Sequence, residues 1–121
     1  MKKKTALIFG GSGQDGTFLS YILLKKNYKV ICVSRRKKKI NNHKILNIHK
    51  KIFIKNVNFY KKEEIKKLII NSNCKEIYFL AGLSQPVLSF KKQNQTLKSN
   101  ILPIYYILET VRELNRNIKV Y

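Results

Sequence analysis

Short apolar runs alternate with amphipathic segments along the chain. Four runs rich in β-branched residues have the character of strands buried in a parallel sheet, and they lie at 5–9, 29–33, 52–57 and 76–80. Segments with apolar residues at helical spacing lie at 18–26, 63–70 and 94–115, and 118–121 resembles the start of a fifth strand. This order predicts a doubly wound α/β fold, in which crossover helices connect the strands of one parallel sheet.

Several segments add detail to this plan. Residues 34–51 are polar and basic, and they are compatible with a short helix or with an irregular surface excursion. Glu63 and Glu64 fall in the first turn of the second predicted helix, where the helix dipole favours acids. The first predicted helix has apolar residues at helix-face spacing: Phe18, Leu19, Ile22, Leu23 and Leu24.

The composition fits one soluble domain. The chain has 121 residues, of which 44% are hydrophobic, enough for one core and too few for a second domain. No apolar run approaches the 18 residues of a membrane span, and the run after Lys4 is too short for a signal peptide. Cys32 and Cys74 have apolar or element-end contexts and no CxxC spacing. We therefore expect structural thiols in a reducing, cytoplasmic compartment.

The charge balance is strongly basic. Lysine and arginine total 26 against 6 acids, which gives a formal net charge of +20 and makes nucleic acid or an anionic membrane the default partner. The excess is mostly lysine, however, and it accompanies many asparagines and isoleucines, as an AT-rich coding sequence produces. The basic residues are scattered, without an aromatic-spaced RNA-binding signature. We therefore predict no nucleic-acid or membrane partner, and keep nucleic-acid binding as an alternative that salt titration tests.

The turn after the first strand carries a phosphate-binding pattern. Residues 10–16, here called the glycine loop, read Gly10-Gly11-Ser12-Gly13-Gln14-Asp15-Gly16. They fit both GxxGxxG and GxGxxG, lie between a predicted strand and a predicted helix, and precede a second strand. Such glycines permit a tight turn and close approach of backbone N–H groups to a pyrophosphate at the helix N-terminus. The pattern predicts a Rossmann-type dinucleotide site, and the alternative is a glycine-rich turn with no ligand.

The end of the second strand indicates which dinucleotide is bound. NAD-binding domains usually place an acid here for the ribose hydroxyls, whereas this chain has Ser34 followed by Arg35 and Arg36. A guanidinium can hold a 2′-phosphate through paired, charge-assisted hydrogen bonds. We therefore predict NADP as the cofactor. The alternative is that the two arginines belong to the general basic excess.

Other candidate groups lack the partners that catalysis needs. His43 and His49 lie in the basic segment without acidic or cysteine partners, so we interpret them as exposed loop histidines and predict no metal site. Ser12 and Ser84 have no histidine at a readable spacing, which leaves a hydrolase triad unsupported. For Asp15 we expect a role in ordering the loop or capping the helix.

The quoted residues resemble a known family. The glycine loop, Arg35-Arg36, the run Glu76-Ile77-Tyr78-Phe79-Leu80-Ala81-Gly82-Leu83-Ser84 and Leu88-Ser89-Phe90 are similar to the extended short-chain dehydrogenase/reductases. Within that family, the GQDG form of the loop resembles the GDP-mannose 4,6-dehydratases. The resemblance covers nearly the whole chain. Gly82 and Leu83 depart from the commoner Ala-Gln, and Gln95 stands where a tyrosine is frequent.

The resemblance implies a set of cofactor contacts. The phosphates would lie on the glycine loop and the 2′-phosphate on Arg35 with Arg36 beside it. Asn58 and Phe59 would lie near the adenine, where the family has an Asp-Leu pair, and 80–84 would line the cofactor. The expected cofactor contacts are Gly10, Gly11, Ser12, Gly13, Gln14, Asp15, Gly16, Arg35, Arg36, Asn58, Phe59, Leu80, Ala81, Gly82, Leu83 and Ser84.

The resemblance also implies the reaction. The full-length enzyme would oxidise GDP-mannose at C4, eliminate water across C5 and C6, and return the hydride to C6. Its Ser or Thr and its Tyr-x-x-x-Lys follow the fifth strand, beyond Tyr121, so we name no catalytic residue here and expect this chain alone to be inactive. The one Tyr-x-x-x-Lys present, Tyr21 to Lys25, lies on the first helix and is interpreted as chance.

We therefore expect residues 1–121 to be a single, incomplete NADP-binding Rossmann domain, truncated after about the fifth strand. An NADP-dependent epimerase or reductase of the same superfamily, or a non-catalytic nucleotide-binding module, remains an alternative. The resemblance further implies a homo-oligomer, because the family's long helix contributes to a dimer interface. Burial against the sheet would equally explain the apolar stripe on this helix: Ile101, Ile104, Tyr105, Leu108 and Val111.

Overall fold

The computed structural model describes residues 2–35, 41–82 and 93–121, with 93–100 described by backbone alone. Strands and helices alternate, beginning with β1 (Thr5–Phe9), α1 (Gln14–Lys25), β2 (Lys29–Ser34) and α2 (Asn41–Ile45). They continue with β3 (Phe53–Asn56), α3 (Lys62–Ser72), β4 (Glu76–Phe79), α5 (Gln93–Leu114) and β5 (Lys119–Val120). All strand pairs are parallel, in the order β3-β2-β1-β4-β5. The predicted doubly wound α/β fold is confirmed.

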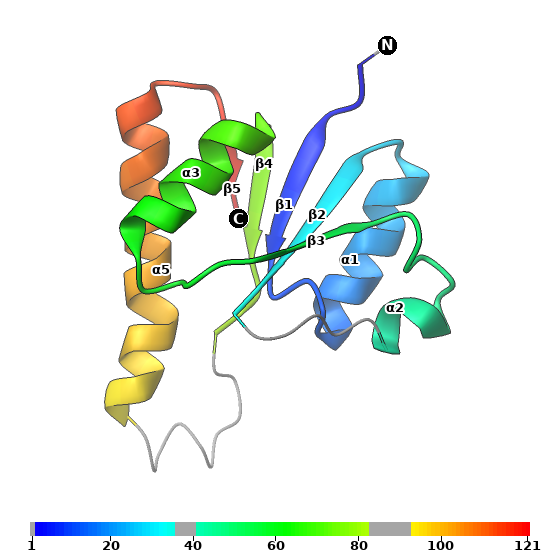
Figure 1. Ribbon diagram of the computed structural model, residues 1–121, viewed down its shortest axis with the longest axis horizontal. Coiled ribbons are helices and arrows are strands. Elements are labelled where there is room, and N and C mark those ends of the chain that lie inside the picture. The colour runs from blue at the N-terminus through cyan, green and yellow to red at the C-terminus, as the bar shows by residue number, and fades with distance from the viewer. Residues whose placement is uncertain (1, 36–40, 83–92) are drawn as a thin grey trace.

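The helices cover both faces of the sheet. Figure 1 shows α3 and α5 on one face and α1 with α2 on the other. Side chains of β1 alternate between the faces, so that Leu7 and Phe9 pack toward α3 and α5 while Ala6 and Ile8 pack toward α1. Every residue of β1 is buried. Burial on both faces explains why the central strands are continuous apolar runs in the sequence.

The first helix begins earlier than predicted and buries only part of its apolar face. It starts at Gln14, within the glycine loop, because small residues there carry no apolar pattern that would reveal a helix. Leu23 is buried, but Phe18 and Ile22 are 52% and 49% exposed, so the sheet covers only part of the apolar face that the spacing indicates. The helix also approaches the sheet through small residues: Gly16, Thr17 and Ser20.

Helix α5 contains Pro103, as predicted, and only part of its apolar stripe is buried. Within the stripe, Val111 packs against the core, whereas Ile101, Tyr105 and Leu108 are at least half exposed. Ile107, which is fully buried, lies outside the predicted stripe. Burial against the sheet therefore fails to explain the stripe as a whole. In the part of the chain whose placement is described, no helix is long and apolar enough to cross a bilayer.

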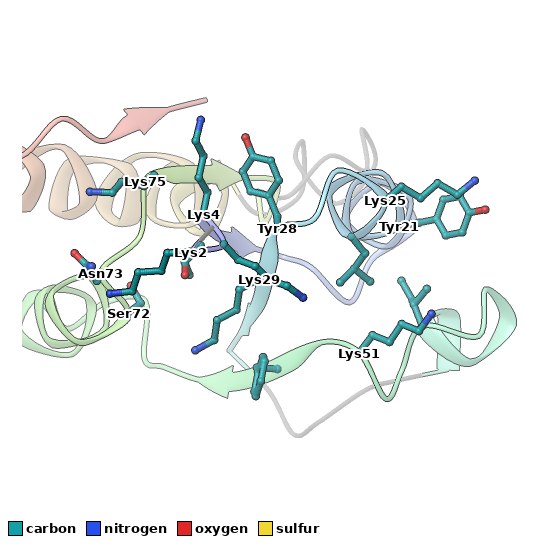
Figure 2. A pocket seen from close by; sticks show the side chains of 15 residues that line it. Lys2, Lys4, Tyr21, Lys25, Tyr28, Lys29, Lys51, Ser72, Asn73 and Lys75 are labelled. Carbon is teal, nitrogen blue, oxygen red and sulfur yellow. The ribbon is translucent and has the colours of Figure 1, made fainter.

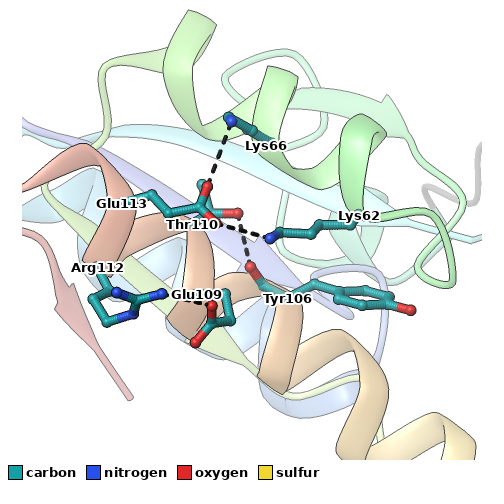
Figure 3. A network of polar contacts seen from close by, with 7 residues as sticks. All are labelled: Lys62, Lys66, Tyr106, Glu109, Thr110, Arg112 and Glu113. Atoms are coloured by element: carbon teal, nitrogen blue, oxygen red, sulfur yellow. Dashed lines mark hydrogen bonds and ion pairs between the residues drawn. The ribbon is translucent and has the colours of Figure 1, made fainter.

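Ion pairs join α3 to α5. Glu113 receives a hydrogen bond from Lys62 at 2.9 Å and pairs with Lys66 at 3.4 Å, as Figure 3 shows. Within α5, Arg112 donates to Glu109 at 2.9 Å. These contacts lie at the partly exposed edge of a helix pair whose apolar sides pack together against the sheet.

Asparagine takes the left-handed position after each helix. The four non-glycine residues with positive φ among those described are Asn27, Asn47, Asn73 and Asn115, with φ between 48° and 64°. Asn73 caps α3 in this way, and its N–H donates to the Ile70 carbonyl. Asparagine is the residue that best replaces glycine there. The asparagine-rich composition therefore supplies the helix stops of the fold.

Candidate functional site

The glycine loop turns the chain from β1 into α1 through close backbone contacts. Gly10 has φ +84°, and a Cβ built on it would lie 2.8 Å from the Ala81 backbone. A Cβ on Gly16 would lie 2.5 Å from the Gly10 carbonyl oxygen, and one on Gly11 would lie 2.6 Å from Cys32 Cβ. Only glycine fits at these three positions. Gly13 differs, because its Cβ would meet one neighbouring atom at an ordinary 3.5 Å.

The loop presents polar groups suited to an anion. Gln14, Asp15 and Gly16 form the first turn of α1, where N–H groups have no intrahelical acceptor and the helix dipole is positive. The Ser12 hydroxyl is buried and has no hydrogen-bond partner in the structure. Gly13 occupies the N-cap position without a side-chain cap, so the expected capping role of Asp15 is wrong. Asp15 is an exposed first-turn acid instead.

A cavity of about 340 Å³ lies at the carboxyl ends of the strands. We call it the carboxyl-edge cavity, and its lining is drawn from the loop and from the ends of β2, β3 and β4. Its lining residues are Gly10, Gly13, Val33, Ser34, Arg35, Phe59, Leu80, Ala81 and Gly82. Seven of these nine belong to the set selected from the sequence. Ligands of open parallel sheets bind in this place, where the strand order reverses.

Arg35 is the one charged side chain in the described lining of this cavity, and that lining holds no carboxylate. Its guanidinium donates to the Tyr60 hydroxyl at 3.2 Å, and its Cζ lies 5.8 Å from the centre of the Phe59 ring. These contacts hold the cation at the end of β2. Arg36, the second predicted arginine, lies outside the described residues, as do Leu83 and Ser84.

Asn58 and Phe59 have separate roles in the structure. Phe59 is 2% exposed, and its ring packs edge-on against Phe9 at a centroid distance of 5.2 Å. Asn58 is exposed, and its Oδ1 accepts a hydrogen bond from the Tyr60 N–H at 2.9 Å. The Asn58 amide thus shapes the turn that brings Phe59 and Tyr60 beside Arg35.

His43 is buried directly behind the glycine loop, and His49 is partly buried with its Nδ1 shielded from solvent, so the prediction of exposed loop histidines is wrong for both. His43 is 0% exposed, and its Nε2 lies 2.8 Å from the Gly11 carbonyl oxygen and 3.9 Å from Cys32 Sγ. Burial lowers the pKa of His43, with the Gly11 hydrogen bond opposing and His49 adding to the shift. The neighbouring Asn42 donates to the Ser12 carbonyl at 3.1 Å. Burial also raises the pKa of Cys32, which keeps it a thiol.

A larger concavity opens at the opposite, amino edge of the sheet. It has a volume of about 1170 Å³ and is lined by lysines from the N-terminal segment, α1, β2 and two connections: Lys2, Lys3, Lys4, Lys25, Lys29, Lys51 and Lys75. Figure 2 labels all of these except Lys3. Tyr21 also lines it, with the Lys25 ammonium 4.6 Å from its ring centre. The single Tyr-x-x-x-Lys of the chain therefore lies across the sheet from the carboxyl-edge cavity.

Several residues around the carboxyl-edge cavity were not predicted from the sequence. Val33 lines it, and Tyr60, Asn42 and His43 contact Arg35 or the glycine loop. The polar character of 34–51 concealed the two α2 residues, because neither has a local pattern that marks it as buried. Among the described residues, no cluster of three or more His, Cys, Asp or Glu side chains is arranged to hold a metal ion.

Comparison with known proteins finds relatives among the GDP-mannose 4,6-dehydratases. The family model described as GDP-mannose 4,6 dehydratase matches residues 7–121. The GDP-mannose 4,6-dehydratase of Vibrio cholerae serotype O1 is 29% identical over 121 residues, which cover 94% of this chain and 32% of that protein. The GDP-mannose 4,6 dehydratase of Drosophila melanogaster is 29% identical over 130 residues, covering 99% and 33%. The chain thus spans about a third of the length of these relatives.

Solved structures agree on the fold. UDP-glucose 4-epimerase from Bifidobacterium longum, in complex with NAD+ and UDP, superposes with a TM-score of 0.82 and 21% identity, over 93% of this chain and 34% of that one. L-threonine dehydrogenase from Clostridium difficile gives a TM-score of 0.79 and 24% identity, over 99% and 36%. At these identities the likeness establishes the Rossmann-type fold.

Proposed function

The chain belongs to the GDP-mannose 4,6 dehydratase family, and we propose that it is the NADP-binding part of a nucleotide-sugar 4,6-dehydratase acting on GDP-mannose. The observation that carries the cofactor proposal is the carboxyl-edge cavity, which joins the glycine loop to Arg35. The family match and the curated relatives support the substrate and the reaction. The two buried free cysteines support a cytoplasmic location, because reducing compartments keep thiols unpaired.

The glycine loop and Arg35 carry the hydrogen-bond donors and the positive charge that the phosphates of a dinucleotide require. The buried, unpartnered Ser12 hydroxyl and the first-turn amides of Gln14 and Asp15 would hold the pyrophosphate. Arg35 would hold the 2′-phosphate, and no carboxylate in the described lining opposes that charge. NADP supplies a hydride acceptor and donor when bound. The chain's own contribution is to bind and orient the dinucleotide at the sheet edge.

Calorimetric titration of the purified chain tests the cofactor. NADP+ should bind more than tenfold tighter than NAD+, and Arg35→Gln should remove most of that preference while leaving NAD+ affinity unchanged. Arg116→Gln is the matched control, because this guanidinium lies near Cys74, which precedes β4 at the opposite edge of the sheet. Equal affinity for both dinucleotides in the unaltered chain would refute the NADP assignment.

Turnover requires groups that the described cavity lacks. The only Tyr-x-x-x-Lys among these 121 residues faces the amino edge, away from the carboxyl-edge cavity. We expect the purified chain to bind cofactor without converting GDP-mannose, as followed by chromatography of the sugar nucleotide. Formation of a 4-keto-6-deoxy sugar nucleotide by this chain would contradict that expectation.

The exposed part of the α5 stripe supports a homo-oligomeric enzyme. Ile101, Tyr105 and Leu108 are 54%, 54% and 50% exposed and recur at helical spacing on one side of α5. A second α5 would remove these side chains from water. Sedimentation measurements on the chain and on Leu108→Lys test this part of the proposal, since a dimer should dissociate in the variant.

A further inference from the structure

Helix α2 contacts the glycine loop through two consecutive side chains. Asn42 Nδ2 donates to the Ser12 carbonyl at 3.1 Å, and His43 Nε2 lies 2.8 Å from the Gly11 carbonyl oxygen. A carbonyl oxygen can only accept, so the proton of His43 is on Nε2. The other ring nitrogen, Nδ1, is buried and has no partner. The geometry therefore selects one neutral tautomer of His43.

The surroundings of His43 argue against a role in direct contact with a substrate. Its ring is 0% exposed, so it has no direct route to a substrate in solution. The Cys32 thiol lies 3.9 Å from Nε2. It also shares a hydrogen bond of 3.4 Å with the Ser20 hydroxyl. Burial holds the pKa of His43 below its usual value, which keeps the ring neutral. His43 is therefore a buried, neutral hydrogen-bond donor to the Gly11 carbonyl.

The hydrogen bond that holds the Gly11 carbonyl in place also fixes the direction of the next backbone N–H group. In a trans peptide the C=O and the following N–H point in opposite directions, and none of the described peptide bonds is cis. Holding the Gly11 oxygen toward α2 therefore turns the Ser12 N–H away from α2. The same interaction fixes the segment that carries the unpartnered Ser12 hydroxyl.

We propose that His43, assisted by Asn42, is a positioning residue that holds the glycine loop in the conformation that binds the cofactor pyrophosphate. This inference rests on the proposed function. The pyrophosphate is common to NADP and NAD, so the contribution of His43 should affect both dinucleotides equally. Arg35 should affect NADP alone. The two kinds of residue are thus separable by the ratio of affinities.

The experiment compares binding of NADP+ and NAD+ to four variants of the purified chain by calorimetric titration. His43→Leu removes the hydrogen bond and leaves the Gly11 carbonyl buried without a donor, which should weaken both cofactors by about tenfold or more. His43→Gln keeps a neutral side-chain N–H donor and should recover most of the affinity. Asn42→Ala removes a partly buried contact and should weaken both cofactors by about fivefold. Asn41→Ala, at an exposed asparagine of the same helix without a described contact to the loop, is the matched control for Asn42→Ala and should bind as the unaltered chain does.

The outcomes distinguish this inference from the proposed function. If the unaltered chain binds neither dinucleotide, the proposed function fails. If it binds NADP+ and the His43 and Asn42 variants bind equally well, the positioning role is refuted and the cofactor site stands. If His43→Leu does not fold, His43→Gln and Asn42→Ala still decide the matter. A change in the ratio of NADP+ to NAD+ affinity in any of the three His43 and Asn42 variants would also overturn the inference, because it would place these residues at the 2′-phosphate.

Discussion

Replacing single glycines of the loop by alanine should separate folding from binding. A methyl group on Gly16 would lie 2.5 Å from the Gly10 carbonyl oxygen and 2.6 Å from Gly11 Cα, where ordinary contact begins at 3.4 Å. Both neighbours are backbone atoms, so no side-chain rotation can relieve the overlap. A methyl group on Gly13 would meet the Gly10 oxygen at 3.5 Å, and Gly13 has φ −73°, which alanine adopts freely.

The expected stabilities follow from these contacts. Overpacking costs about 1–3 kcal/mol and here involves two rigid neighbours. Alanine at position 16, inside α1, recovers about 1 kcal/mol through its better helix propensity. We therefore expect Gly16→Ala to lower the free energy of unfolding by roughly 2 kcal/mol. At position 13, the loss of a good N-cap residue and the smaller entropy of the unfolded chain oppose each other, so Gly13→Ala should change stability by less than about 0.5 kcal/mol.

Cofactor affinity should respond differently from stability, because Gly13→Ala, the variant that leaves stability nearly unchanged, should weaken binding. Gly13 lines the carboxyl-edge cavity, so its added methyl group would enter the space assigned to the pyrophosphate. Gly13→Ala should stay folded and lose NADP+ affinity by more than tenfold. Urea unfolding followed by circular dichroism gives the stabilities, and calorimetry gives the affinities. Gly16→Ala with the stability of the unaltered chain would refute the close approach of loop and helix, and Gly13→Ala with full affinity would refute the placement of the phosphates.

Three further outcomes test other parts of the structure. Asn73→Ala should destabilise the fold by about 1 kcal/mol, and Asn73→Gly should not, because glycine tolerates the left-handed φ of 50°; urea unfolding of both variants checks this. Burial is the main cause that raises the pKa of Tyr78 to about 12, and the negative charge of Glu76 adds to the shift. An unfolded tyrosine ionises near pH 10, so the contribution of Tyr78 to stability should be complete below pH 10 and decline as pH rises toward 12. Tyr78→Phe should lose that decline, and a spectrophotometric phenol titration should lose its last-ionising tyrosine. Glu113→Gln should cause a small loss of thermal stability that disappears in 1 M salt, because the Lys62 pair is partly exposed and screened; an equal loss at high salt would contradict this.

The local pattern of the chain determined much of the architecture. The predicted strand ranges agree with the observed ones to within one residue at each end. For β1 and β2 the reason is burial on both faces, which leaves no polar side to interrupt the run. The mostly exposed β3 contains Lys55 and Asn56, and its position in the alternation of strands and helices supports its prediction. The glycine loop was recognisable because its spacing follows from close contacts that exclude a Cβ, with backbone atoms at Gly10 and Gly16 and with the Cys32 side chain at Gly11. Arg35 could be selected because the end of β2 lies beside that loop in any such sheet.

What the sequence could not determine is which side chains the distant elements cover. Phe18 and Leu23 lie on the same helix and are both apolar, yet one is half exposed and the other buried, because the sheet covers only one side of α1. His43 stands in a polar segment, and its burial depends on α2 folding back behind the glycine loop more than thirty residues earlier in the chain. Periodicity reports the side of an element on which apolar residues gather, whereas burial depends on what packs there. That is decided by contacts between residues far apart in the chain, and such contacts exist only in the tertiary structure.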